Sequence, residues 1–80
     1  MDDFSEGKER FLDLLKQVDP AVTAVIPSAP SNGHFLISLT KGHSRKFMSL
    51  SEDDLIDLSA DHTIMKEVEE EIKEHIAAMK

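Results

Sequence analysis

Apolar and polar residues alternate along two neighbouring segments, and this pattern restricts the fold more than any other feature of the sequence. The segments are His34–Thr40 and Arg45–Leu50, and the polar stretch Lys41-Gly42-His43-Ser44 separates them. A period of two is typical of a strand with one buried face, and two such strands joined by a short glycine-containing turn form a β-hairpin. The sequence therefore predicts an antiparallel hairpin in the middle of the chain.

The same pattern selects the register of this hairpin. A four-residue loop pairs Thr40 with Arg45 and places five apolar side chains on one face, those of Phe35, Ile37, Leu39, Met48 and Leu50. A loop one residue shorter would set Leu39 opposite Arg45. Because a slip of one residue turns every side chain of a strand to the other face, we expect the even-length loop. The second face carries Leu36 and Phe47, which indicates that part of it is covered.

Helical periodicity comes before the hairpin. Apolar residues follow the 3.6-residue period of a helix at Phe11, Leu14, Leu15 and Val18. The pattern ends at Asp19-Pro20, because proline disfavours helical angles in the residue before it. We expect a helix from Asp3 or Ser5 to Val18, and then a strand over the β-rich segment Ala21–Ile26.

A short helix is expected directly after the hairpin, from about Glu52 to Leu58. Ser51 is a favourable N-cap residue, and acidic residues follow it in the first turn, where the helix dipole favours negative charge. Leu50 and Leu55 have the spacing of a hydrophobic staple across this junction.

A longer helix completes the predicted elements. Ser59 or Asp61 caps it, and it runs to about Met79. Its apolar ladder repeats every four residues, at Ile64, Val68, Ile72 and Ile76. The sequence thus predicts an α+β fold. It is a small two-layer domain with an N-terminal helix, a three-stranded antiparallel β-meander, a short helix and a long C-terminal helix, the helices packing on one sheet face. We expect residues 1–80 to form one domain.

Composition narrows the function classes. The chain has no cysteine, so we expect neither disulfides nor a thiolate metal site, and the four histidines lack metal-ligand spacing. No nucleophile elbow or phosphate-binding loop is found. We expect no enzyme activity, no cofactor and no metal. The acidic start, Met1-Asp2-Asp3-Phe4, precedes no apolar run, and no run approaches a bilayer span. We therefore expect a cytoplasmic protein without a membrane contact.

Charge is unevenly distributed along the chain, whose formal net charge is −7. Residues 20–51 contain three cations and no Asp or Glu, whereas the segments on either side are acidic. One candidate site is an acidic face on the last helix, formed by Glu67, Glu70 and Glu74. The alternative is a basic hairpin tip that binds an anion or nucleic acid, formed by Lys41, His43, Arg45 and Lys46. Both sets also have a purely structural interpretation, as a solvated helix face and a soluble turn.

The leading functional hypothesis is a small regulatory or adaptor protein that binds another protein through its acidic helical surface. Nucleic acid is disfavoured as a partner, because affinity for its backbone comes from neutralising many phosphates and this chain is acidic. A third possibility is a homodimeric structural module in which a basic hairpin meets the acidic helix of a second copy. We expect a monomer in preference to this dimer, since one small sheet can accept one long and one short helix.

Overall fold

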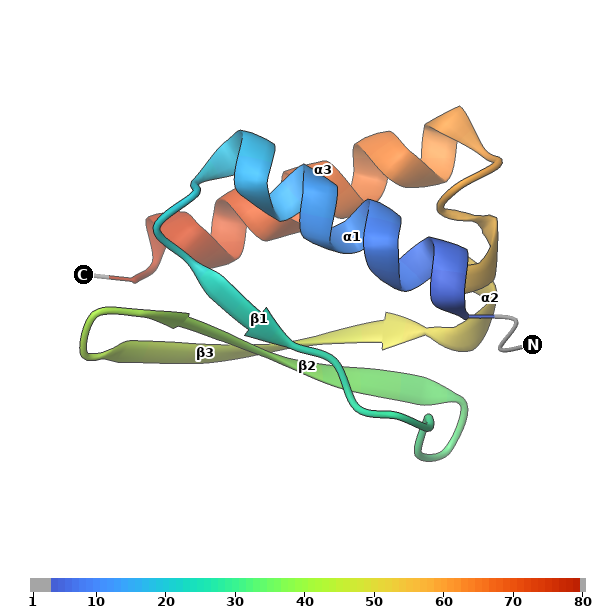
Figure 1. Cartoon of the computed structure of the whole chain (residues 1–80), viewed down its shortest axis with the longest axis horizontal. Coiled ribbons are helices and arrows are strands. Elements are labelled where there is room, and N and C mark those ends of the chain that lie inside the picture. Colours follow the sequence, from blue (N-terminus) through green and yellow to red (C-terminus); the bar gives the residue numbers. More distant parts are fainter. Residues whose placement is uncertain (1–3, 80) are drawn as a thin grey trace.

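The computed structural model describes residues 4–79 and has two layers, a sheet and a set of helices on one of its faces (Figure 1). Helix α1 (Ser5–Val18) leads into strands β1 (Thr23–Val25), β2 (His34–Lys41) and β3 (Ser44–Ser51), which are followed by α2 (Glu52–Asp57) and α3 (His62–Ala77). The strands pair in the order β1-β2-β3, and all are antiparallel. The predicted fold class and meander are therefore confirmed. A helix start at Asp3 lies outside the described residues.

The register of the hairpin agrees with the prediction. Thr40 pairs with Arg45, Ile37 with Met48 and Phe35 with Leu50. The strands are longer than expected, because Lys41 and Ser44 also pair and leave Gly42 and His43 as a two-residue turn. Gly42 has a φ of +59°, a conformation that glycine adopts without steric cost and that tight hairpin turns require.

A second tight turn leads into β2. The amide of Ser31 donates to the carbonyl of His34 and the amide of His34 donates back, at 2.8 and 3.0 Å. Between them, Asn32 and Gly33 both have positive φ, the combination that makes Asn-Gly a favoured two-residue turn. The expected strand Ala21–Ile26 is shorter in the structure, Thr23–Val25, and before it the amide of Val22 donates to the carbonyl of Asp19 in the turn that follows α1.

Side-chain caps begin both later helices. The hydroxyl of Ser51 accepts a hydrogen bond from the amide of Asp54 at 3.2 Å, as predicted. Of the two candidate caps for α3, Asp61 is the one used, and its carboxylate accepts from the amides of Thr63 and Ile64. These caps satisfy helix amides that have no partner inside the helix.

The core lies between the sheet and the helices. Its buried side chains are Phe11, Leu14 and Leu15 of α1, Val22 before β1, Phe35, Ile37 and Leu39 of β2, Met48 and Leu50 of β3, Leu55 and Leu58 around α2, and Val68, Ile72 and Met79 of α3 and its end. The five hairpin side chains that the alternation places on one face are thus all buried.

The opposite face of the sheet is open, and here the expectation of a covering segment is wrong for the described residues. All helices pack on the other face (Figure 1). Val25, Leu36 and Phe47 are 67%, 59% and 53% exposed. The register places Val25, Ser38 and Phe47 in one row across the three strands, with Leu36 in the next row. We call Val25, Leu36 and Phe47 the apolar patch.

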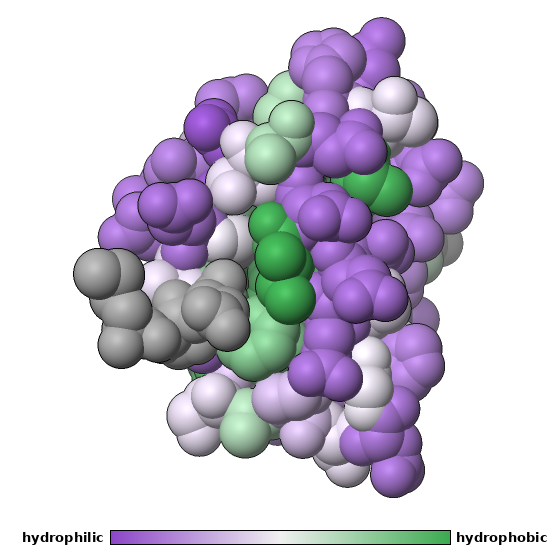
Figure 2. All heavy atoms as spheres, turned by 90° about the vertical axis from the view of Figure 1, so that its right-hand side faces the viewer, coloured by the Kyte–Doolittle hydropathy of each residue, from purple (hydrophilic) through white to green (hydrophobic). Residues whose placement is uncertain are grey.

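The remaining exposed large apolar side chains of residues 4–79 lie on two different helices. They are Leu12 on α1 and Ile56 on α2. Figure 2 views the end of the molecule that lies to the right in Figure 1, the end of α2, and hydrophilic atoms line one side of a narrow column of apolar ones there. Single exposed apolar residues are normal on a protein surface, whereas a contiguous group on one open face is typical of a contact surface.

Candidate functional site

The four residues of the expected basic tip do not converge on one point. Lys41 pairs with Ser44 and Lys46 with buried Leu39, so alternation along the strands turns both lysines towards the helix side of the sheet. Arg45 pairs with Thr40, whose parity is that of the open face, and His43 occupies the turn. The structure therefore divides these side chains between two faces and a turn, which is a poor arrangement for holding a single anion.

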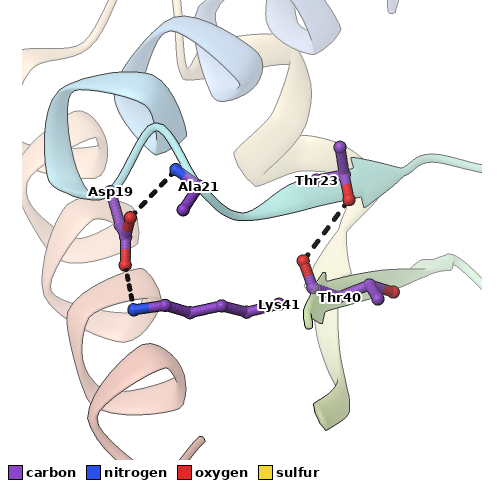
Figure 3. Close-up of polar contacts among 5 residues, drawn as sticks. All are labelled: Asp19, Ala21, Thr23, Thr40 and Lys41. Carbon is purple, nitrogen blue, oxygen red and sulfur yellow. Dashed lines mark hydrogen bonds and ion pairs between the residues drawn. The ribbon is translucent and has the colours of Figure 1, made fainter. Parts of the chain in front are cut away.

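Lys41 also has a partner within the fold. Its Nζ lies 2.6 Å from Oδ2 of Asp19, the residue after α1, and Oδ1 of Asp19 accepts from the amide of Ala21 (Figure 3). The hydrogen bond from Lys41 and then that from the Ala21 amide hold the pKa of Asp19 below its usual value of 3.8. Close by, the hydroxyl of Thr23 donates to the carbonyl of Thr40 at 3.3 Å. Lys41 thus links the hairpin to the end of α1.

The three expected acidic residues do share a surface. Glu67, Glu70 and Glu74 are all exposed on α3, spaced three and four residues apart, so they form one stripe along the helix. Within residues 4–79, ion pairs join Lys41 to Asp19 and Lys73 to Glu69, the second at 3.7 Å, and neither involves a residue of this stripe. The stripe therefore presents carboxylates that no described cation neutralises by direct contact.

A shallow hollow lies between α3 and β3. It has a volume of about 350 Å³ and is lined by Lys46 and Phe47 of β3 and by Glu74, His75 and Ala78 of α3. Glu71 lies one helical turn before His75, and Glu67 lies two turns before Glu74. Both are therefore on the same side of α3 as the hollow. They are exposed as well, and we call Glu67, Glu71 and Glu74 the acidic edge of α3. One flank of the molecule thus combines this acidic edge with β3.

Strand β3 is the last strand of the sheet that residues 4–79 form. In an antiparallel sheet, the amide and carbonyl of one residue point to the same neighbour, and the direction alternates along the strand. His34 directs both groups to Ser31, away from β3. The hairpin register then directs the backbone groups of Lys46, Met48 and Leu50 to β2, and those of Arg45, Phe47 and Ser49 outwards.

The outward amides and carbonyls of Arg45, Phe47 and Ser49 form no backbone hydrogen bond with any described residue. Their side chains lie on the open face, where Phe47 belongs to the apolar patch. Sequence reasoning did not single out this edge, although the meander order itself implies it, because the third strand of a meander has a neighbour on one side only.

Two further hollows lie on the helix side. One, of about 290 Å³, is lined by Arg10 of α1, by residues 58–62 and by Met65, and the other, of about 250 Å³, combines Arg10 with Glu6, Glu9, Asp13 and Ser59. The Asp61 carboxylate in the first is already used as the cap of α3. Within the described part of the chain, no group of three His, Cys, Asp or Glu side chains could hold a metal ion.

Among the helices of residues 4–79, none is both long and apolar enough to cross a bilayer.

Comparisons with models of known protein families, with curated proteins and with solved structures found no match.

Proposed function

We propose that this chain is a small, non-enzymatic adaptor or regulatory protein that binds another protein through the acidic surface of α3. The observation that carries the proposal is the stripe of Glu67, Glu70 and Glu74, which is exposed and has no ion-pair partner among residues 4–79. An unpaired field of one sign speeds association with a partner of the opposite sign and disfavours wrong partners. The partner is therefore a protein with a basic surface.

The distribution of cations favours this surface over the basic tip. An anion site needs several donors aimed at one point. Lys41 is held by Asp19, and Arg45 and Lys46 project from opposite faces of β3. In addition, the net charge of −7 repels nucleic acid.

The proposal includes no catalytic role. The hollows are shallow, and the lowered pKa of Asp19 is explained by its hydrogen bonds from Lys41 and from the Ala21 amide. The sequence lacks cysteine, which agrees with a reducing compartment, and we place the protein in the cytoplasm.

A quantitative pull-down from native lysate tests the function. The untagged protein is immobilised and challenged with lysate at low and at moderate salt, beside two variants. One carries Glu67→Lys, Glu70→Lys and Glu74→Lys, and the other carries Arg45→Gln and Lys46→Gln. Because all these side chains are exposed, neither variant should lose much stability.

We expect a basic protein to be retained by the wild type and by the Arg45/Lys46 variant, and lost with the acidic-stripe variant. Its retention should fall with added salt, since exposed charges are screened over about 10 Å at 0.1 M. The proposal is wrong if the Arg45/Lys46 variant loses more of the captured protein, or if no protein distinguishes the wild type from the acidic-stripe variant.

A further inference from the structure

The outer edge of β3 offers three features side by side that one kind of ligand satisfies together. The first is a row of outward backbone groups, those of Arg45, Phe47 and Ser49, which no described residue pairs. The second is the apolar patch on the open face, and the third is the acidic edge of α3 on the helix side. An extended chain laid along β3 would meet all three.

We propose that β3 accepts an extended segment of the partner protein as a fourth strand, and that this segment alternates apolar residues with Lys or Arg. The proposal rests on the proposed function, and it names how and by which chemistry the partner is recognised. Strand addition to a free sheet edge is a general mode of peptide recognition, in which backbone hydrogen bonds supply affinity and alternate side chains supply specificity.

The apolar half of the alternation follows from the open face. Side chains of an added strand that point to this face would lie beside Phe47, which is 53% exposed, and would extend the row of Val25, Ser38 and Phe47 by one strand. Neighbouring side chains on one face of a sheet are close enough for apolar or aromatic contact. The open face carries no Asp or Glu on any of its three strands, so a Lys or Arg of the added strand would find no carboxylate partner on this face.

The basic half follows from the helix side. The other side chains of the added strand would point towards the layer of α3. Glu74 lines the hollow beside Lys46 and Phe47, and Glu71 and Glu67 continue its side of the helix. Lys and Arg have stems long enough to reach carboxylates on a neighbouring element while their own backbone stays in the sheet. Lys46 offsets part of this field at one end of the strand, which leaves Glu67 and Glu71 as the stronger attraction.

A second copy of this chain fits the edge poorly. Antiparallel pairing of β3 with its copy would bring two acidic edges together, and every copy carries a net charge of −7. Like charges brought close without cations between them disfavour association. Charge complementarity therefore selects a basic strand over self-pairing.

The experiment uses the full chain and a library of random dodecapeptides displayed on phage. Peptides enriched on the wild type are synthesised, and their affinities are measured by titration calorimetry. The variant Ser49→Pro removes one outward amide and leaves the bonds from β3 to β2, as proline is tolerated at the free side of an edge strand. Ser49→Ala is its matched control, and circular dichroism shows whether each variant is folded.

The charge of the edge is tested separately, so that the result does not depend on how well Ser49→Pro folds. One variant carries Glu67→Gln, Glu71→Gln and Glu74→Gln. The control variant makes the same change in net charge on α1, with Glu6→Gln, Glu9→Gln and Asp13→Asn, all exposed.

We expect enriched peptides in which apolar residues alternate with Lys or Arg. Their affinity should fall more than about tenfold with Ser49→Pro and about tenfold with the acidic-edge variant, as the loss of three exposed charge pairs implies. Ser49→Ala and the α1 variant should bind as the wild type does.

Three results overturn the proposal: no enriched peptide, peptides without this alternation, or peptides that bind the Ser49→Pro and acidic-edge variants normally. The last would leave the proposed function intact, with the partner bound elsewhere on the acidic surface. Concentration-dependent dimers that disappear with Ser49→Pro would assign the edge to a second copy instead.

Discussion

Gly7 of α1 lies directly against the backbone of Leu55 in α2, so closely that a β-carbon at position 7 would overlap the Leu55 carbonyl oxygen. Leu55 is fully buried, and the space between the two backbones admits no side chain larger than the hydrogen atom of glycine. This contact sets the distance between α1 and the short helix that continues β3. It therefore limits how closely α1 and α2 can pack at the end of the sheet where β3 finishes and β2 begins.

Gly7→Ala should destabilise the protein, although alanine is the better helix former by about 1 kcal/mol. The added methyl group meets backbone, which cannot rotate away, and overpacking of this kind costs about 1–3 kcal/mol. Urea denaturation measures the change, with Glu6→Ala at the exposed neighbouring position as the control. A Gly7→Ala variant at least as stable as the wild type would contradict the close contact of the two helices.

The junction between hairpin and α2 gives a second stability test. Leu50 and Leu55 are both buried, with exposures of 2% and 0%. Leu50→Ala and Leu55→Ala should each lower the free energy of unfolding by about 2–5 kcal/mol, as other buried leucine truncations do. Leu36→Ala is the matched control, because Leu36 is exposed on the open face of the same hairpin. Equal denaturation midpoints for all three variants and the wild type would remove this junction from the core.

The Asp19–Lys41 pair predicts a dependence of stability on acid pH. The pKa of Asp19 is lowered in the folded state, chiefly by Lys41, so the pair stabilises the fold above the unfolded-state pKa near 3.8. This contribution should be lost as the pH falls through the lower folded-state pKa. Carboxyl-carbon NMR titration should give Asp19 a pKa below 3.8, which moves back towards 3.8 in Lys41→Ala. A wild-type value at or above 3.8 would contradict the pair.

We expect the protein to be a monomer. Val68 and Ile72 of α3 are buried within their own chain, so the apolar ladder of this helix leaves little for a second copy to cover. The charge of −7 also disfavours self-association. Sedimentation equilibrium at micromolar concentration should give the chain mass of 9.0 kDa. A mass about twice as large would show a dimer and would move the apolar patch or the β3 edge into a homotypic interface.

Local chemistry made much of this fold predictable. The pairing of Thr40 with Arg45 was correct because the alternation of Phe35, Ile37 and Leu39 leaves one register that buries a whole face. The cap at Ser51 was correct because its hydroxyl serves an amide three residues away. The four-residue loop was not distinguishable from a two-residue turn, since both give the same register and differ only in whether Lys41 and Ser44 also pair.

The features that depend on distant segments were not predictable. The need for glycine at position 7 arises from α2, and the engagement of Lys41 arises from Asp19 at the end of another element. For the candidate sites, spacing on one helix correctly indicated that Glu67, Glu70 and Glu74 share a surface. The basic residues were grouped because they are close in the sequence, but the alternation of side chains along a strand separates them in space. Arg45 and Lys46 are neighbours in the chain and lie on opposite faces of the sheet.

Amide hydrogen exchange of the free protein shows whether the outer edge of β3 is unpaired. Protection should alternate along the strand. The amides of Lys46, Met48 and Leu50 should exchange slowly because they bond to β2, and those of Arg45, Phe47 and Ser49 should exchange at nearly unprotected rates. Uniform slow exchange at all six positions, in a protein shown to be monomeric, would mean that this edge is already covered and that β3 cannot accept an added strand.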